Sequence, residues 1–149
     1  MNSLVLFYTR SGTTKVVATK IAEILNCDIE EVVDCKNRDG ILGWLSSGRD
    51  AFRKYLTTIK PIAKDLSSYE HIIIGTPVWA GNVTPAIRTV VKNYCDKFNK
   101  VTFFCTMGIT GDKKVFAELE LLCKQKPVSK LAINRSEVIS GEYVKKIKI

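Results

Sequence analysis

The sequence predicts an α/β protein: a three-layer, doubly wound fold around a five-stranded parallel sheet of order 2-1-3-4-5. Apolar segments alternate with segments of helical periodicity along the chain, which is typical of a parallel sheet with helices on both faces. The first, third and fourth apolar segments are apolar almost throughout, as expected for strands at the sheet centre. The second alternates charged and apolar residues, which favours an edge position.

The expected elements follow from this pattern in order. Strands are expected at 4–8, 28–33, 72–74, 101–105 and 129–133, and helices at 13–25, at 40–56, after position 84 and after position 112. Thr84 suits the N-cap of the third helix and Pro85 its first position, and Asp112 suits the cap of the fourth. The residues around 143–147 predict a final helix that is short or truncated.

The composition limits the possible functions. The 149 residues suit a single domain over 1–149, and the 46% hydrophobic content suits a folded chain. The longest apolar run is about five residues, whereas a membrane span needs roughly 20. The N-terminus lacks the basic and apolar regions of a secretory signal, so a cytoplasmic location is expected.

The charge and the cysteines point to no nucleic-acid or metal site. The net charge is +8, which favours acidic partners, but the basic residues are spread along the chain without a compact cluster. The five cysteines form no C-x-x-C pair, and His71 is the only histidine. Scattered reduced thiols are the simplest interpretation.

The predicted topology directs attention to three loops. In a sheet of order 2-1-3-4-5, the chain reverses its winding between the first and third strands, and ligands bind in the crevice beyond the carboxyl ends of the strands there. The loops after the first, third and fourth strands are therefore the candidates for a binding site.

The loop after the first strand, T-R-S-G-T-T-K at 9–15, holds more hydrogen-bond donors than a turn requires. It opens a helix, whose free N–H groups and positive dipole end favour an anion. Hydroxyls can add donors, and Gly12 allows close approach of the backbone. The spacing matches neither Walker A nor G-x-G-x-x-G, so a phosphate loop and a capped helix start both stay open.

The other two loops are suited to a flat ring. The loop at 75–82, G-T-P-V-W-A-G-N, carries Trp79 among small residues, where its indole can stack on a planar ring or pack onto its own scaffold. The loop at 105–113, C-T-M-G-I-T-G-D-K, can hydrogen-bond the edge of a ring or bind nothing. A phosphate loop beside a ring-stacking loop describes a mononucleotide site.

These motifs together resemble the flavodoxin family. T-R-S-G-T-T is similar to its phosphate loop, T/S-x-T/S-G-x-T, G-T-P-V-W-A-G to the loop whose aromatic residue stacks on flavin, and C-T-M-G to its third loop. The resemblance covers most of the chain and implies a flavodoxin-like fold with non-covalent FMN. It implies that the phosphate is held by Thr9, Arg10, Ser11, Gly12, Thr13 and Thr14. It implies that the flavin ring lies between Pro77, Val78, Trp79, Ala80 and Gly81 on one side and Thr106, Met107 and Gly108 on the other.

The chain departs from this family pattern in three respects. Many flavodoxins are strongly acidic, whereas the charge here is +8 and the loops have only Asp112 as an acid. Cations favour a negatively charged reduced flavin, which predicts a less negative potential for the second electron than an acidic flavodoxin shows. These cations are Arg10, Lys15 and Lys113. The third loop has no aromatic residue, so stacking is expected on one side, with an apolar contact from Met107 or Ile109. The final helix is short.

The favoured function is electron transfer. No catalytic residue is predicted, because His71 is expected at the end of the sheet opposite the crevice and Cys105 as a buried residue. FMN would supply the chemistry and carry electrons between redox partner proteins, with the chain a monomer or a homodimer. The alternatives are an FMN-dependent NAD(P)H:quinone-type reductase and a binding protein that has lost flavin.

The basic segment at 40–55 has two interpretations. It lies beside the crevice and binds a substrate or redox partner, or it is a loosely packed amphipathic helix with a solvated basic face. Helical spacing places Leu45, Phe52, Tyr55 and Leu56 on one side of it.

Overall fold

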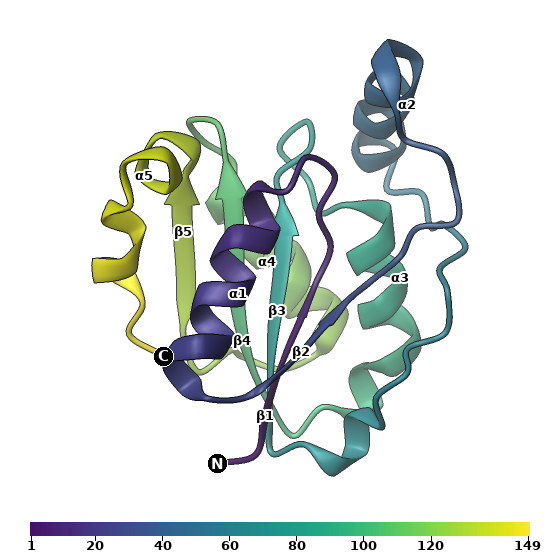
Figure 1. Ribbon diagram of the computed structural model, residues 1–149. Coiled ribbons are helices and arrows are strands. Elements are labelled where there is room, and N and C mark those ends of the chain that lie inside the picture. The colour runs from purple at the N-terminus through teal and green to yellow at the C-terminus, as the bar shows by residue number, and fades with distance from the viewer.

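A computed structural model describes all 149 residues and shows one sheet with helices on both faces (Figure 1). The strands pair in parallel in the order β2-β1-β3-β4-β5. Their bounds are β1 (Ser3–Phe7), β2 (Asp28–Glu31), β3 (His71–Pro77), β4 (Lys100–Met107) and β5 (Lys130–Asn134). The predicted fold class and strand order are confirmed.

The first four helices follow the predicted order, but the final helix predicted around 143–147 is a 3-10 segment, and the short helix at 135–140 was not predicted. The helices are α1 (Thr13–Leu25), α2 (Gly40–Phe52), α3 (Pro85–Tyr94), α4 (Asp112–Cys123) and α5 (Arg135–Ser140), with 3-10 segments at Leu66–Ser68, Cys95–Lys97 and Glu142–Lys146. Thr84 is the N-cap of α3 and Pro85 its first residue, as predicted. The cap of α4 is Gly111, with a φ of 119°, and Asp112 is the first residue inside the helix. None of the helices combines the length and the apolar character needed to cross a membrane.

Side-chain alternation along the central strands divides the core into two layers. On one face, Leu4, Ile72 and Ile74 pack with residues of α3 and α4, and on the other, Val5 and Ile73 pack with residues of α1. All five are fully buried. Each contributes about 1.5–3 kcal/mol of hydrophobic stabilisation, so the sheet is a rigid support for the loops at its carboxyl edge.

Helix α2 covers neither face of the sheet. It stands beyond the carboxyl ends of the strands, to one side of the loops that leave β1 and β3 (Figure 1). The chain then returns along the sheet to β3, and Ile59 and Ile62 pack against the core on the way. This position brings α2 to the edge of the sheet at which the sequence predicts a binding site.

Candidate functional site

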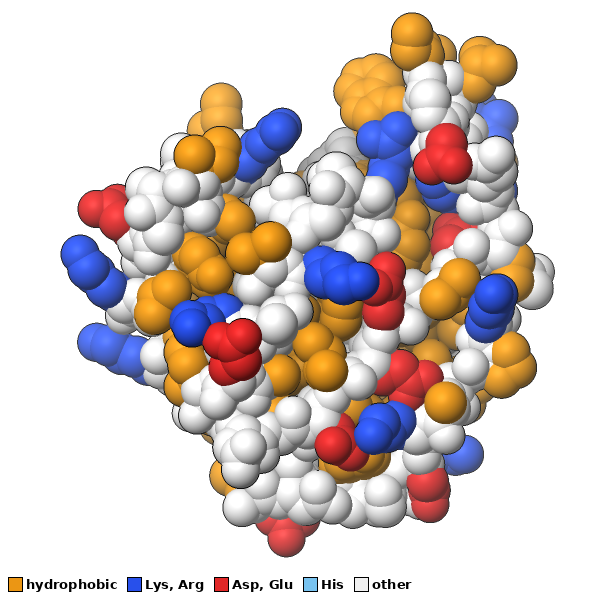
Figure 2. Space-filling view, viewed as in Figure 1, with side chains coloured by type: hydrophobic (Ala, Val, Ile, Leu, Met, Phe, Trp, Pro, Cys, Tyr) orange, Lys and Arg blue, Asp and Glu red, His pale blue; other side chains and the backbone are white.

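A cavity of about 670 Å³ opens at the carboxyl ends of β1, β3 and β4. Figure 2 shows the hollow between α2 and the loops, with hydrophobic side chains on the end of α2 that borders it. Of the residues predicted to form the site, Gly12 and Gly81 do not line the cavity. Those that do are Thr9, Arg10, Ser11, Thr13, Thr14, Pro77, Val78, Trp79, Ala80, Thr106, Met107 and Gly108.

The first loop presents free donors toward the start of α1. Gly12 is the N-cap and has a φ of 95°, a left-handed conformation that glycine adopts without strain. Its N–H donates to Thr9 Oγ1 at 3.0 Å, which tightens the loop. No other backbone N–H of residues 9–15 has an acceptor within the chain, and those nearest the start of α1 belong to Ser11, Thr13, Thr14 and Lys15. Together with the dipole of α1, they make this end of the cavity suitable for an anion.

The first and third loops are tied together by two hydroxyl groups. Thr14 Oγ1 lies 2.8 Å from Thr106 Oγ1, and both residues are buried. One hydroxyl donates to the other, so the Thr14 side chain is partly committed to this contact. The bond fixes the loop after β4 against the loop after β1.

Trp79 projects from a tight turn after β3. The backbone N–H of Trp79 donates to the carbonyl oxygen of Asn82 at 3.1 Å, and the backbone N–H of Asn82 donates to the carbonyl oxygen of Trp79 at 2.9 Å. The residues between them, Ala80 and Gly81, have φ of 47° and 72°, as a type I′ turn requires. Gly81 therefore shapes the turn that presents Trp79, and this explains why it does not line the cavity itself.

The Trp79 ring is held by two neighbours. Tyr8 meets it edge to face, with ring centroids 5.4 Å apart and an angle of 83° between the planes. The Arg38 guanidinium lies 5.8 Å from its centroid, within the range of a cation–π interaction. Burial, followed by the charge of Asp34, raises the pKa of Tyr8 to about 12, so its phenol stays neutral.

Five further residues line the cavity that the sequence analysis did not assign to it: Trp44, Leu45, Ser47 and Gly48 of α2, and Arg135 at the start of α5. The glycines and the tryptophan of the segment 40–55 were the available signal, and of its two interpretations the structure favours a position beside the crevice. Arg135 gave no signal, because it lies in no motif.

Helix α2 is amphipathic with its apolar side outward. The residues that it buries are Gly43, Ser47, Asp50 and Ala51. Leu45 and Phe52 are 55% and 68% exposed. The interpretation of an amphipathic helix with a solvated basic face is therefore incomplete, because large apolar side chains are in solvent as well as basic ones. The buried side is small and polar because it packs on the backbone and charges of residues 34–38 instead of the hydrophobic core.

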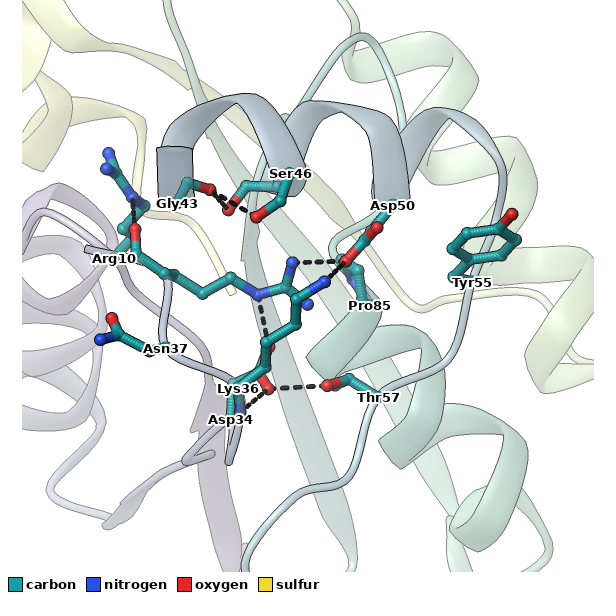
Figure 3. A network of polar contacts seen from close by, with 12 residues as sticks. Arg10, Asp34, Lys36, Asn37, Gly43, Ser46, Asp50, Tyr55, Thr57 and Pro85 are labelled. Carbon is teal, nitrogen blue, oxygen red and sulfur yellow. Dashed lines mark hydrogen bonds and ion pairs between the residues drawn. The ribbon is translucent and has the colours of Figure 1, made fainter. Parts of the chain in front are cut away.

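Paired charges anchor α2 to the segment before it (Figure 3). Buried Asp50 accepts from Lys36 Nζ at 2.6 Å, Arg38 Nη1 at 2.6 Å and Arg49 Nη2 at 2.8 Å. Buried Arg38 also pairs with Asp34 at 3.0 Å. Burial alone would raise the pKa of Asp50, but these hydrogen bonds outweigh it and hold the pKa well below its usual range.

Two other arginines donate hydrogen bonds to backbone carbonyl groups at and beside the two ends of α2. Arg10, in the loop after β1, donates to Arg38 O at 2.9 Å and to Gly40 O at 3.2 Å. Arg88, on α3, donates to Ala51 O at 3.2 Å and Tyr55 O at 2.9 Å. Two of the five N–H donors of Arg10 are thus used to fasten α2 to the first loop.

The charged groups that line the cavity are both cations, Arg10 and Arg135. Lys15 points elsewhere and pairs with Glu31 at 3.0 Å, and Lys113 is exposed outside the cavity. Of the three cations predicted near the site, only Arg10 lines the cavity. Arg135, which was not predicted, also lines it.

No acid–base pair faces the cavity. His71 lies at the amino end of β3, where its Nε2 is 2.9 Å from Thr102 Oγ1, and burial lowers its pKa. Cys105 is fully buried in β4, and burial raises the pKa of its thiol to about 12. The lining of the cavity therefore contains no histidine, cysteine or carboxylate side chain.

The fold and the cavity define a doubly wound α/β protein with a cavity at its topological switch point, where ligands bind in folds of this class. The model of the family described as Flavodoxin matches residues 2–139, so the chain belongs to the flavodoxin family. A comparison with curated proteins found no significant match.

Solved structures share the fold over most of the chain. A crystal structure of a flavoprotein in complex with FMN from Lactobacillus acidophilus NCFM has a TM-score of 0.77 and 25% identity, covering 93% of this chain and 97% of that one. The NMR structure of the apo-form of the flavoprotein from the same organism has a TM-score of 0.66 and 27% identity, covering 93% and 95%. Oxidised Flavodoxin 1 from Bacillus cereus is 18% identical with a TM-score of 0.56, covers 100% of both chains and is similar in fold.

Proposed function

We propose that this protein binds FMN non-covalently in the cavity and carries electrons between redox partner proteins in the cytoplasm. The observation that carries the proposal is the convergence of three loops, one rich in free donors and one bearing Trp79, on one cavity of about 670 Å³. The similar flavoprotein from Lactobacillus acidophilus was crystallised with FMN, which supports the choice of ligand.

The donors at the start of α1 fit a phosphate. A phosphate monoester carries three strong acceptor oxygens, and the free N–H groups of the first loop have no other acceptor in the chain. The hydroxyls of Thr9, Ser11 and Thr13 line the same part of the cavity and add donors. A nearby cation, Arg10, compensates part of the negative charge.

The other half of the cavity fits a planar ring. Trp79 is fixed by its turn and its neighbours, so it offers a stacking surface that needs no rearrangement. Val78, Met107 and Gly108 add an apolar part to this lining. When bound, FMN supplies the acceptance and donation of electrons. The role of the protein residues is to orient the ring, exclude water and set the local charge.

The wall formed by α2 favours a second candidate function, an FMN-dependent reductase that takes hydride from NAD(P)H for a quinone-type acceptor. Trp44 and Leu45 extend the cavity beyond the three loops, which suits an enzyme that also binds a small substrate. A carrier needs only an accessible edge of the ring. The two functions differ in their need for a nicotinamide donor.

A reduction experiment tests the proposal. The purified protein is titrated with FMN, and binding at a ratio of one to one is expected from the loss of free flavin fluorescence. NADH and then NADPH are added without oxygen while the flavin absorbance is followed. A bound flavin that stays oxidised with both nucleotides but bleaches with dithionite supports the carrier. Rapid bleaching with either nucleotide supports the reductase, and failure to bind FMN overturns both.

A further inference from the structure

We propose that Trp44, on α2, is a second aromatic wall of the ring-binding part of the cavity and supplies the stacking surface that the third loop lacks. The inference deepens the proposed function and rests on it, since the ring concerned is that of FMN. In the sequence analysis, all contacts to the ring came from the loops after β3 and β4.

Trp44 differs in position from the other large apolar residues at the exposed side of α2. Its side chain is 63% exposed, yet it lines the cavity next to Leu45. Ile41, Leu42 and Phe52 are exposed and do not line it. A planar ring placed against Trp44 would remove apolar area of both partners from water, and an aromatic pair adds to this gain.

The third loop offers no competing aromatic surface. Met107 and Gly108 line the cavity, while Ile109 is exposed and lies outside its lining. Trp79 already packs against Tyr8 and Arg38. Trp44 and Trp79 are the only aromatic residues in the cavity lining, and they come from different elements.

The anchoring of α2 gives Trp44 a defined position before any ligand binds. A Cβ on the adjacent Gly43 would overlap the backbone of Arg38, so the helix lies directly on that segment. Ser47 Oγ donates to Gly43 O at 2.6 Å, and Arg10 holds Gly40 O from the first loop. The backbone at Trp44 is thus held in place, so contact with a ligand has to order only the rotamers of the indole side chain.

Binding measurements on the full-length apoprotein test the inference. The ligands are FMN and lumiflavin, which has the ring without the ribityl phosphate. Trp44→Ala is expected to weaken both by the same factor, about 5- to 150-fold, as for the loss of one aromatic stacking contact. Trp44→Phe is expected to restore most of the affinity. Leu42→Ala is the matched control, because Leu42 is an exposed residue of the same helix that does not line the cavity.

A spectroscopic readout separates contact from a structural role. The chain has two tryptophans, so 5-fluorotryptophan labelling gives two ¹⁹F resonances, which Trp44→Phe and Trp79→Phe assign. Both resonances are expected to shift when lumiflavin binds, and this holds even if Trp44→Ala fails to fold. A Trp44 resonance that stays unshifted at saturating FMN, or an equal affinity of wild type, Trp44→Ala and Leu42→Ala, overturns the inference while FMN binding stands. A wild type that binds no FMN overturns the proposed function with it.

Discussion

The loops at the carboxyl ends of the strands and the helix α2 line the same cavity, but they are attached to the protein in different ways. The loops continue from strands whose apolar side chains are fully buried between two layers of helices. Helix α2 is attached by Asp50, by arginine side chains and by the close contact of Gly43, while its large apolar residues face solvent.

This difference predicts different stability for the two walls. A loop fixed by a hydrophobic core opens only when the sheet is disrupted, whereas a helix fixed by a few polar contacts can open by itself. The buried charges of α2 stabilise it only as a complete set, because removing one partner leaves the others buried without compensation. We therefore expect α2 to be the part of the site most sensitive to mutation and to pH.

The largest effect is expected from Asp50→Ala. The substitution removes the acceptor shared by Lys36, Arg38 and Arg49, and leaves buried Arg38 with Asp34 alone. The local free energy of opening of α2 should fall by about 3 kcal/mol, the lower end of the cost of breaking a buried pair. Hydrogen exchange should accelerate in residues 40–52, while the amides of β1, β3 and β4 stay protected.

The matched control is Glu23→Ala, which removes an exposed carboxylate paired with Lys20 at 2.9 Å and should leave the stability nearly unchanged, because surface ion pairs contribute little. Acid titration removes the interactions of the Asp50 carboxylate without a mutation, because it protonates that group. Because the folded-state pKa of Asp50 lies below its unfolded value of about 3.9, its stabilisation is present above that pH and is lost as the pH falls below it. If the amides of the sheet and of α2 lost protection against hydrogen exchange equally in Asp50→Ala, the two walls would not differ in stability.

A smaller effect is expected from Gly43→Ala. The added methyl group would overlap the Arg38 backbone, so α2 must shift, at a cost of about 1–3 kcal/mol for overpacking. FMN affinity should fall as well, because Trp44 moves with the helix. Gly48→Ala is the control for stability: its Cβ meets nothing within 4 Å, and the gain in helix propensity should stabilise α2 by up to about 1 kcal/mol. Urea denaturation and FMN titration measure both, and equal behaviour of the two variants would refute the close contact.

The contrast also explains what the sequence could predict. Runs such as Ile72–Ile74 and the spacing in α1 report burial directly, so strand order and the three loops could be predicted from apolar pattern and turn chemistry. In α2 the same rule misleads, because Leu45 and Phe52 are exposed and Asp50 is buried. Its orientation is set by charge pairs between segments, which no local pattern reveals.

The cavity lining shows the same limit at single residues. Twelve of the fourteen predicted site residues line the cavity, since loops after parallel strands meet at one sheet edge. Gly81 fell outside because its role is to shape the turn at Trp79, which motif matching does not distinguish from ligand contact. Arg135 was missed because it reaches the cavity from an element whose packing depends on the completed fold, and Trp44 was covered by only one of the two interpretations of the segment 40–55.

The smallest effect is expected from Arg135→Gln. Arg135 is the first residue of α5, so this substitution changes the cavity lining without touching α2. Arg135 and Arg10 are the charged residues of the lining. Arg135 takes part in none of the contacts that anchor α2, so its removal leaves α2 anchored. Loss of a cation disfavours a negatively charged reduced flavin, and the potential for the second electron should become more negative by the equivalent of about 0.5–1 kcal/mol.

Redox titration of the FMN-loaded protein measures this change in potential. The change should shrink at high salt because Arg135 is exposed. Lys113→Gln, outside the cavity, should change the potential less; an equal or larger change would mean that net charge, and not the lining, sets the potential.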